Sequence, residues 1–128
     1  MSFSFSAASE QRLKGVNPDL VKVVKRAIEI TTVDFTVLEG LRTAARQKQL
    51  LDLGATKTLN SRHLTGHAVD LAPMVGGTVR WDWPLYAKLA KVMEAAAKAE
   101  KVPVEWGGSW SSFRDGPHYQ LPWSSYPG

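Results

Sequence analysis

The chain has 128 residues, of which 44% are hydrophobic, and it contains no cysteine. This length supports one hydrophobic core, so we expect a single domain over residues 1–128. The absence of cysteine excludes disulfides and thiolate metal sites, so any metal must be held by histidine, aspartate or glutamate. The formal net charge of +4 favours a polyanionic partner only weakly, because the basic residues are spread along the chain.

No part of the sequence is typical of a membrane segment. The first residues lack a basic region followed by a long apolar run, and no apolar stretch is long enough to cross a bilayer. We therefore expect a soluble monomer that is made in the cytoplasm without a signal peptide and does not insert stably into a membrane.

The first part of the chain predicts two helices. Residues 6–15 form a short amphipathic pattern with Ser6 or Ser9 as its cap. Asn17-Pro18-Asp19 is a stronger helix start, because it combines an N-cap residue, a proline in the first turn and an acid near the positive end of the helix dipole. One apolar stripe follows, made of Leu20, Val21, Val24, Ala27 and Ile28.

A strand and a third helix are predicted next. Residues 35–39 are rich in β-formers and predict a strand that leaves through Gly40. Thr43 is expected to cap a helix that stops near Gly54. Residues 55–64 have no clear period, so we interpret them as a surface loop, a kind of segment that often carries function.

Residues 68–72 are the strand on which the functional interpretation depends. Side chains alternate along a strand, so Asp70 lies between two alanines on one face, while Val69 and Leu71 point the other way. Small neighbours leave room beside the Asp70 carboxylate for a cation and its water. We therefore expect Asp70 to be functional and its apolar neighbours to belong to the core.

The next segment predicts a hairpin and the clearest helix of the chain. Gly76-Gly77 is typical of a hairpin turn between residues 73–75 and 78–81. Asp82 is the expected cap of the helix that follows, and Pro103 marks the exit from it. The apolar stripe of this helix is Leu85, Leu89, Val92, Met93 and Ala96.

The last part of the chain predicts two short strands, residues 104–106 and 118–121, followed by an irregular tail over residues 122–128. Helices come first and the strands recur without a regular β-α-β alternation. This order favours an α+β domain with a small, mostly antiparallel sheet packed with three to four helices.

Three residues in this pattern can supply a catalytic zinc site. Such a site needs three protein ligands and one open position for water, and His63, Asp70 and His118 are the candidates. Asp115 lies three residues before His118 and could take the proton of the water and pass it to a leaving amine. Arg42 could hold the carbonyl oxygen or carboxylate of a substrate.

These residues form a two-part motif that resembles a known family. Ser61-x-His63-x-x-Gly66-x-Ala68-x-Asp70, followed by Asp115-x-x-His118, is similar to the zinc peptidases that include D-Ala-D-Ala carboxypeptidases and phage L-alanyl-D-glutamate endolysins. The opening Met-Ser-Phe-x-Phe, the segment Leu41-Arg42-Thr43 and the run Asp-Leu-Ala-Pro at 70–73 look most like the endolysin branch.

The resemblance implies a fold and a set of roles. The fold would be similar to that of hedgehog and DD-peptidase domains. His63, Asp70 and His118 would bind Zn²⁺, and Asp115 would be the catalytic base. Arg42 and Ser61 would contact the substrate, which is the peptide stem of bacterial peptidoglycan.

Our hypothesis is a phage or prophage endolysin that cleaves the stem peptide, at the L-Ala-D-Glu bond, and reaches the wall by a route through the inner membrane. The nearest alternative is a D-Ala-D-Ala carboxypeptidase or dipeptidase. A rival from another class is a basic, non-catalytic module that binds wall polymer or nucleic acid and uses the metal only for structure. A structural site usually has a fourth protein ligand, which His67 or Asp115 would have to provide.

Each single residue also has a simpler interpretation. His67 follows His63 by four positions, but Gly66 lies between them, so we do not expect it to be a ligand. Arg42 could be a surface residue paired with Glu39, and Ser61 or Asp115 could only stabilise turns. Four aromatic residues either border the cleft or belong to the core, namely Trp106, Trp110, Phe113 and Tyr119.

Overall fold

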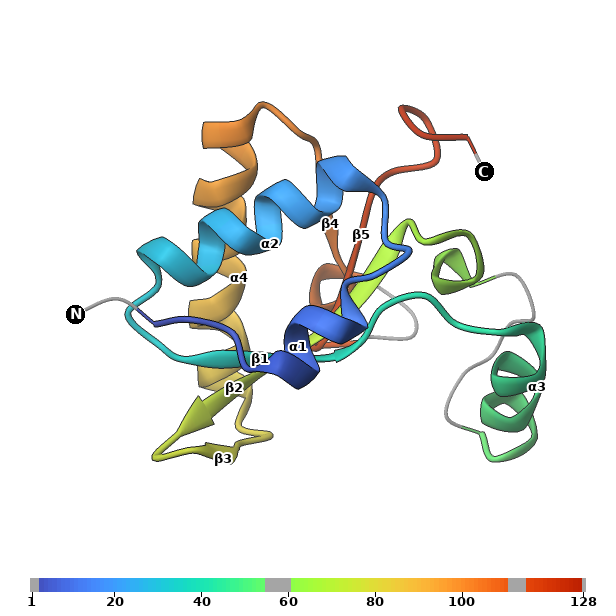
Figure 1. Cartoon of the computed structure of the whole chain (residues 1–128), viewed down its shortest axis with the longest axis horizontal. Helices are drawn as coiled ribbons and strands as arrows, with labels where there is room; N and C mark the ends of the chain where they lie inside the picture. The colour runs from blue at the N-terminus through green and yellow to red at the C-terminus, as the bar shows by residue number, and fades with distance from the viewer. Residues whose placement is uncertain (1–2, 55–60, 111–114, 128) are drawn as a thin grey trace.

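The computed structural model describes residues 3–54, 61–110 and 115–127 (Figure 1). The elements in these ranges are α1 (Ala7–Arg12), α2 (Pro18–Ile30), β1 (Phe35–Glu39), α3 (Ala44–Asp52), the 3-10 helix η1 (Arg62–Thr65), β2 (Ala68–Val75), β3 (Thr78–Val79), α4 (Trp83–Glu100), β4 (Glu105–Trp106), the 3-10 helix η2 (Gly107–Ser109) and β5 (His118–Gln120). None of the helices in these ranges combines the length and the apolar character that crossing a bilayer requires.

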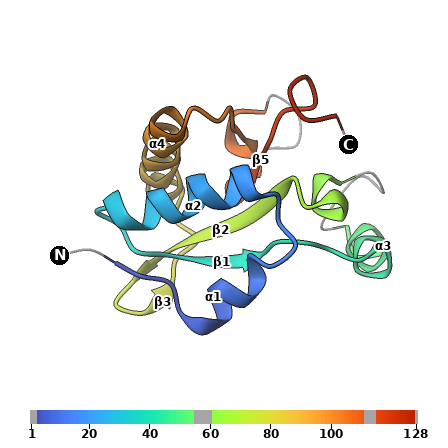
Figure 2. The ribbon, with the colours of Figure 1, turned by 45° about the horizontal axis from the view of Figure 1, so that its top comes forward.

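One sheet organises the fold, and β2 is at its centre (Figure 2). The strand order is β1-β2-β5-β4, and β3 pairs with the far end of β2 to complete the hairpin. All pairings between the described strands are antiparallel. This arrangement confirms the predicted α+β class with a small antiparallel sheet.

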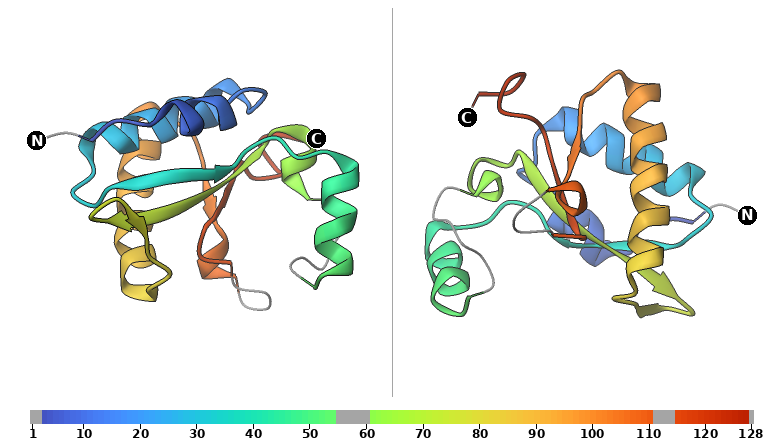
Figure 3. Two further views of the ribbon diagram at one scale, coloured as in Figure 1. Left: turned by 60° about the horizontal axis from the view of Figure 1, so that its bottom comes forward. Right: turned by 180° about the vertical axis from the view of Figure 1, so that it is seen from behind.

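The helices lie on different sides of the sheet. Figure 3 shows α1 and α2 on one side, while α3 and the η2 turn extend on the other. The helix α4 crosses α2 and packs against it, and it also contacts β2 (Figure 1). The core between these helices and the sheet includes Val69 and Leu71, both fully buried. The expected division of β2 into a core face and a face that carries Asp70 is therefore confirmed.

The helix starts agree with the sequence in most respects. Asn17 caps α2, and its side chain accepts a hydrogen bond from the Asp19 backbone N–H at 2.9 Å. Thr43 caps α3 in the same way. Asp82 is at the N-cap position of α4, but its side chain makes no capping hydrogen bond and instead forms an ion pair with Arg80.

The predicted bounds of the three short strands β3, β4 and β5 differ from the structure. Strand β3 ends two residues earlier than the predicted 78–81, and β4 and β5 are each one residue shorter than predicted. Residues 55–60 of the predicted loop lie outside the described residues, but its last part forms η1. The turn after η1 is possible because Gly66 has a φ of +77° and lies against the backbone oxygen of Gly15, where a Cβ would come within 2.4 Å.

Helix α1 is shorter than the predicted 6–15, and its residues protect the outer edge of the sheet. Ser6 is the N-cap, whereas Ser9 is buried and accepts a hydrogen bond from the Val37 backbone N–H at 3.1 Å. Arg12 donates to the Val37 carbonyl at 3.0 Å. Side chains of α1 therefore satisfy both backbone groups of Val37 on the edge strand β1, which leaves fewer groups for pairing with another chain.

This contact predicts the effect of a small substitution on stability. Ser9→Ala leaves the buried Val37 N–H without its acceptor, so the free energy of unfolding should fall by about 1–3 kcal/mol. Urea unfolding measures this change, and Ser4→Ala at an exposed position is the matched control. Equal stability of the two variants would contradict the role that we give to Ser9.

Candidate metal centre

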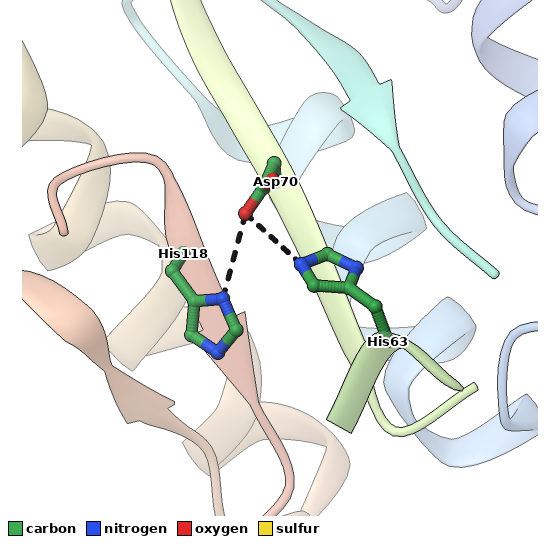
Figure 4. A group of neighbouring side chains, drawn as sticks. All are labelled: His63, Asp70 and His118. Atoms are coloured by element: carbon green, nitrogen blue, oxygen red, sulfur yellow. Dashed lines mark hydrogen bonds and ion pairs between the residues drawn. The ribbon is translucent and has the colours of Figure 1, made fainter. Parts of the chain in front are cut away.

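The three predicted metal ligands lie together in the structure (Figure 4). Asp70 is in the middle of β2, His118 opens β5, and His63 is in the η1 turn. Oδ1 of Asp70 lies 3.2 Å from Nε2 of His63 and 3.5 Å from Nδ1 of His118. The described residues contain one such group of potential ligands, and its donor atoms lie within 4.8 Å of one another.

Strand register brings Asp70 and His118 together. The two residues are direct partners in the antiparallel pairing of β2 with β5. Direct partners across an antiparallel pair have their side chains on the same face and Cβ atoms about 4.5–5.5 Å apart. On the other side of β2, the partner of Asp70 is Glu39 of β1. The sheet thus presents a row of three polar residues on the face opposite Val69 and Leu71.

His63 comes from a turn, and several hydrogen bonds fix its ring. Ser61 caps η1 by accepting a hydrogen bond from the His63 backbone N–H at 3.1 Å. The ring Nδ1 lies 2.8 Å from the carbonyl oxygen of Gly40. A carbonyl oxygen can only accept, so Nδ1 carries a proton, and in the neutral ring the lone pair of Nε2 faces Asp70.

His118 is oriented by a neighbour on its own strand. Its Nε2 lies 2.7 Å from Oε1 of Gln120, which accepts a hydrogen bond from that nitrogen. Nδ1 is then left to face Asp70 without a proton in the neutral ring. The ring of Trp110 covers His118, with the ring centroids 5.0 Å apart. In their neutral forms both imidazoles therefore present a lone pair to the same carboxylate oxygen, whereas a protonated ring donates a hydrogen bond to it.

This donor set fits a divalent metal. Two imidazole nitrogens and one carboxylate oxygen are the ligands of many three-ligand catalytic sites. A tetrahedral site with metal–ligand bonds of about 2.0–2.1 Å has its donors roughly 3.3–3.4 Å apart, close to the two separations seen here. With both rings neutral, lone pairs and a negative oxygen would face one another, and a cation between them would remove that repulsion.

The electrostatics of the cluster also favour a cation. Burial acts to raise the pKa of Asp70, but hydrogen bonds with His118 and His63 outweigh it and lower that pKa below its ordinary value. Burial acts to lower the pKa of His118, but the hydrogen bond and negative charge of Asp70 raise it above its ordinary value. The site holds a negative charge at its centre and attracts positive charge, either a proton or a metal ion.

Arg42 lies beside the cluster and is buried. Its Nε donates to Glu39, its Nη1 donates to Gln47 Oε1 at 2.7 Å, and its Nη2 lies 3.4 Å from Asp70 Oδ2. Arg42 therefore does pair with Glu39, but it does so inside the protein and not on the surface, with only 7% of its side chain exposed. The contact with Asp70 uses the carboxylate oxygen that does not face the imidazoles.

Asp115 lies at the start of the turn that leads to His118. Its backbone N–H donates to the carbonyl of Gly107 at 3.0 Å, and a Cβ on Gly107 would come within 2.6 Å of the Asp115 carbonyl oxygen. The indole N–H of Trp106 donates to the carbonyl of Gly116 at 2.7 Å. Burial, followed by the negative charge of Asp70, raises the pKa of Asp115, and this shift brings it closer to the range useful for a base near neutral pH.

His67 is separate from the cluster, as the sequence predicts. Its Nδ1 lies 2.6 Å from the Thr65 hydroxyl, and its ring packs at 6.4 Å from that of Tyr126. Burial lowers the pKa of His67, followed by the positive charge of Arg62. Within the described ranges, neither His67 nor Asp115 joins the group of potential ligands, so the fourth ligand of a structural site is not found there.

The predicted aromatic residues have different roles. Tyr119 is in the core. Trp106 is partly buried and packs against the core and against the ring of Trp83. Trp110 borders the cluster through its contact with His118. Phe113 lies outside the described residues.

Sequence reasoning missed the acceptors behind the two imidazoles. Gln120 was not singled out, although strand alternation places it two residues after His118 on the same face. The Gly40 carbonyl and the Gln47 side chain gave no such signal. Both come from other segments and reach the site only through tertiary packing.

Fold and site together are those of a hydrolase with a buried His-Asp-His group that could hold a metal ion. The chain belongs to the phage L-alanyl-D-glutamate peptidase family, whose model matches residues 1–120. This result confirms the resemblance seen in the two-part motif and its endolysin branch.

The relatives agree with this assignment. The chain is 35% identical over 119 residues to the L-alanyl-D-glutamate peptidase of Escherichia phage T5, covering 90% of this chain and 87% of the relative. It is 37% identical over 98 residues to the corresponding peptidase of Listeria phage A118, covering 77% of this chain but only 34% of that longer protein. The crystal structure of the L-Ala D-Glu endopeptidase ChiX from Serratia marcescens is 48% identical and superposes with a TM-score of 0.91, covering 97% of this chain and 93% of that one.

The acceptor behind His118 predicts a change in metal affinity. Gln120→Ala removes the hydrogen bond that sets the ring orientation and the tautomer, so affinity for Zn²⁺ should fall about 10-fold. Chelator competition measures the dissociation constant, and Gln120→Glu, which keeps an acceptor oxygen, should bind at least as tightly as the wild type. A folded Gln120→Ala variant with unchanged affinity would contradict this role.

Proposed function

We propose that this chain is a zinc-dependent endopeptidase that cleaves the L-Ala-D-Glu bond in the stem peptide of bacterial peptidoglycan. The observation that carries the proposal is the buried His63-Asp70-His118 group, with donor separations suited to one metal ion, in a chain of the phage peptidase family. We further propose that residues 1–128 form a single peptidase domain that acts as a monomer.

The three ligands have one task, which is to hold the metal in a fixed orientation. His63 would bind through Nε2, His118 through Nδ1 and Asp70 through Oδ1, because these are the atoms that face one another. Bound there, Zn²⁺ would polarise the scissile carbonyl and lower the pKa of an attacking water. The acceptors on the outer nitrogens hold both rings so that their inner nitrogens face Asp70.

Asp115 is proposed as the proton carrier. Its carboxylate accepts the proton that the attacking water loses and delivers it to the amine nitrogen of D-Glu as the amide bond breaks. The raised pKa of Asp115 supports this role, because a more basic carboxylate takes up a proton more readily. The products are a free L-Ala carboxylate and a free D-Glu amine.

Arg42 and Ser61 are proposed to contact the substrate. Three N–H groups of Arg42 go to protein acceptors, which fixes the guanidinium next to the cluster. Its remaining N–H groups would donate to a substrate oxygen as negative charge builds on it. Ser61 holds the turn of His63 by its hydroxyl oxygen, and its O–H can still donate to the peptide.

The proposed place of action is the wall of a host bacterium. A member of a phage peptidase family would be made in the host cytoplasm and would reach peptidoglycan after an opening forms in the inner membrane. Its activity there would lyse the host, and the purified protein would be antimicrobial. The expected partner is the peptide stem and not nucleic acid. Binding to nucleic acid would be recognised because it weakens steeply with added salt.

Metal removal provides the first test. Exhaustive chelation should abolish cleavage of purified peptidoglycan, and added Zn²⁺ should restore it. His118→Ala should lose both zinc binding and cleavage, because two ligands remain where three are needed. Full activity of the chelated wild type would contradict the proposal. DNA binding without cleavage would favour the alternative of a basic, non-catalytic binding module.

Mass spectrometry of the digested muropeptides identifies the bond. New free amino groups on D-Glu are the expected result for the endopeptidase. Loss of one terminal D-Ala would instead assign the chain as a carboxypeptidase. The same digest, carried out with and without chelator, therefore tests the chemistry and the bond together.

Asp115 can be tested separately from the metal. Asp115→Asn keeps the size of the side chain but removes its basicity, so kcat should fall by about 10²–10⁴-fold while zinc binding stays close to that of the wild type. Asp52→Asn on the exposed end of α3 is the matched control and should keep full activity. Wild-type turnover in Asp115→Asn would assign the base to another group.

A further inference from the structure

Arg62 precedes the ligand His63 and is almost fully buried, with 2% of the residue exposed. Its Nε and Nη2 donate to the Leu121 carbonyl at 3.3 and 2.9 Å, and Nη2 also donates to the Tyr126 carbonyl at 2.6 Å. Its guanidinium carbon lies 4.0 Å above the ring centre of Trp123. One side chain thus joins η1 to the residues that follow β5.

Residues 122–127, which we name the C-terminal segment, contain no helix or strand but are held in place. The Tyr126 backbone N–H donates to the Pro122 carbonyl at 2.9 Å and closes the segment into a turn. The Tyr126 hydroxyl donates to Asp19 at the start of α2 at 2.7 Å. This segment lies beyond residue 120, where the match to the family ends.

Because the Arg62 guanidinium is charged and buried, loss of its hydrogen bonds would destabilise the folded protein. The acceptors of its hydrogen bonds in the described structure are all backbone carbonyls, and its Nη1 is buried without an acceptor among the described residues. A buried guanidinium that loses further partners is strongly destabilised. Displacement of the C-terminal segment would take the Tyr126 carbonyl and the Trp123 ring away from Arg62, which favours a shift of Arg62 and of η1 with it.

The position of His63 is set by a single short turn, η1, whereas strands set the positions of the other two proposed ligands. Asp70 and His118 are on paired strands, whereas His63 is on a 3-10 helix of four residues. Short 3-10 helices have poor hydrogen-bond geometry and little stability of their own. The position of His63 must therefore come from contacts outside η1.

We propose that Arg62 is a positioning residue of the metal centre, which clamps the C-terminal segment against η1 and so fixes His63 for metal binding. The side chain acts through the backbone of its neighbour and does not touch the metal or the substrate. This inference rests on the proposed function only in requiring that His63 binds a metal.

The test compares zinc affinity with fold stability in the same variants. Arg62→Lys keeps the charge but lacks the planar fork that reaches two carbonyls. A chain that stops at Pro122 lacks the rest of the segment but keeps the Leu121 carbonyl as a neutral peptide group. Trp123→Ala removes only an exposed ring that stacks on Arg62. Ser124→Ala, at an exposed position of the same segment, is the matched control.

Chelator competition should show Zn²⁺ affinity about 10-fold weaker in Arg62→Lys and in the shortened chain, with a smaller loss in Trp123→Ala and no change in Ser124→Ala. Circular dichroism and urea unfolding at the same temperature must show that each variant is folded, because lower stability alone does not change the affinity of the folded state. If the first two variants do not fold, Trp123→Ala decides the question.

Wild-type affinity in the folded variants would overturn the inference, and so would a loss of binding that only follows the unfolded fraction. In that case, unchanged cleavage by the wild type would leave the proposed function standing. Failure of the wild type itself to bind Zn²⁺ would overturn both.

Discussion

The contact of the Asp70 carboxylate with two imidazoles is the constraint on which the site depends. A negative oxygen and two nitrogen lone pairs can share this space only when a cation or a proton lies between them. The antiparallel register of β2 and β5 imposes half of this arrangement, because it makes Asp70 and His118 direct partners. A register shift of one residue would turn one of the two side chains to the opposite face and remove the site.

The surroundings of the cluster show how a small sheet can hold such a group rigidly. His63 is tied to the Gly40 carbonyl, His118 to Gln120, and Asp70 to Arg42 through its second oxygen. Gly40 and Arg42 lie in the segment that follows β1, whereas Gln120 is on the same strand as His118. Because these contacts orient the three proposed ligands in advance, little further ordering would oppose metal binding.

The sequence predicted the elements well wherever the signal was local. Asn17 with Pro18, Thr43 with the helix after it, and the Gly76-Gly77 hairpin all act within a few residues, and the structure has them where they were expected. Ser9 is a different case, because its distant partner is the edge strand and not its own helix. The short strands were placed within one or two residues, since their ends depend on how far the neighbouring strand continues.

The sequence by itself determined the family and the kinds of side chain expected in the site. His63, Asp70, His118 and Asp115 belong to a motif with fixed spacing, and strand alternation and turn residues are local patterns that can be recognised in the sequence. Only the tertiary structure decided which ring nitrogen faces the carboxylate, that Arg42 is buried behind Asp70, and that residues after β5 contact the turn of His63 through Arg62. These are interactions between segments far apart in the sequence, and no local pattern encodes them, because strand register and side-chain packing fix them only when the whole sheet has formed.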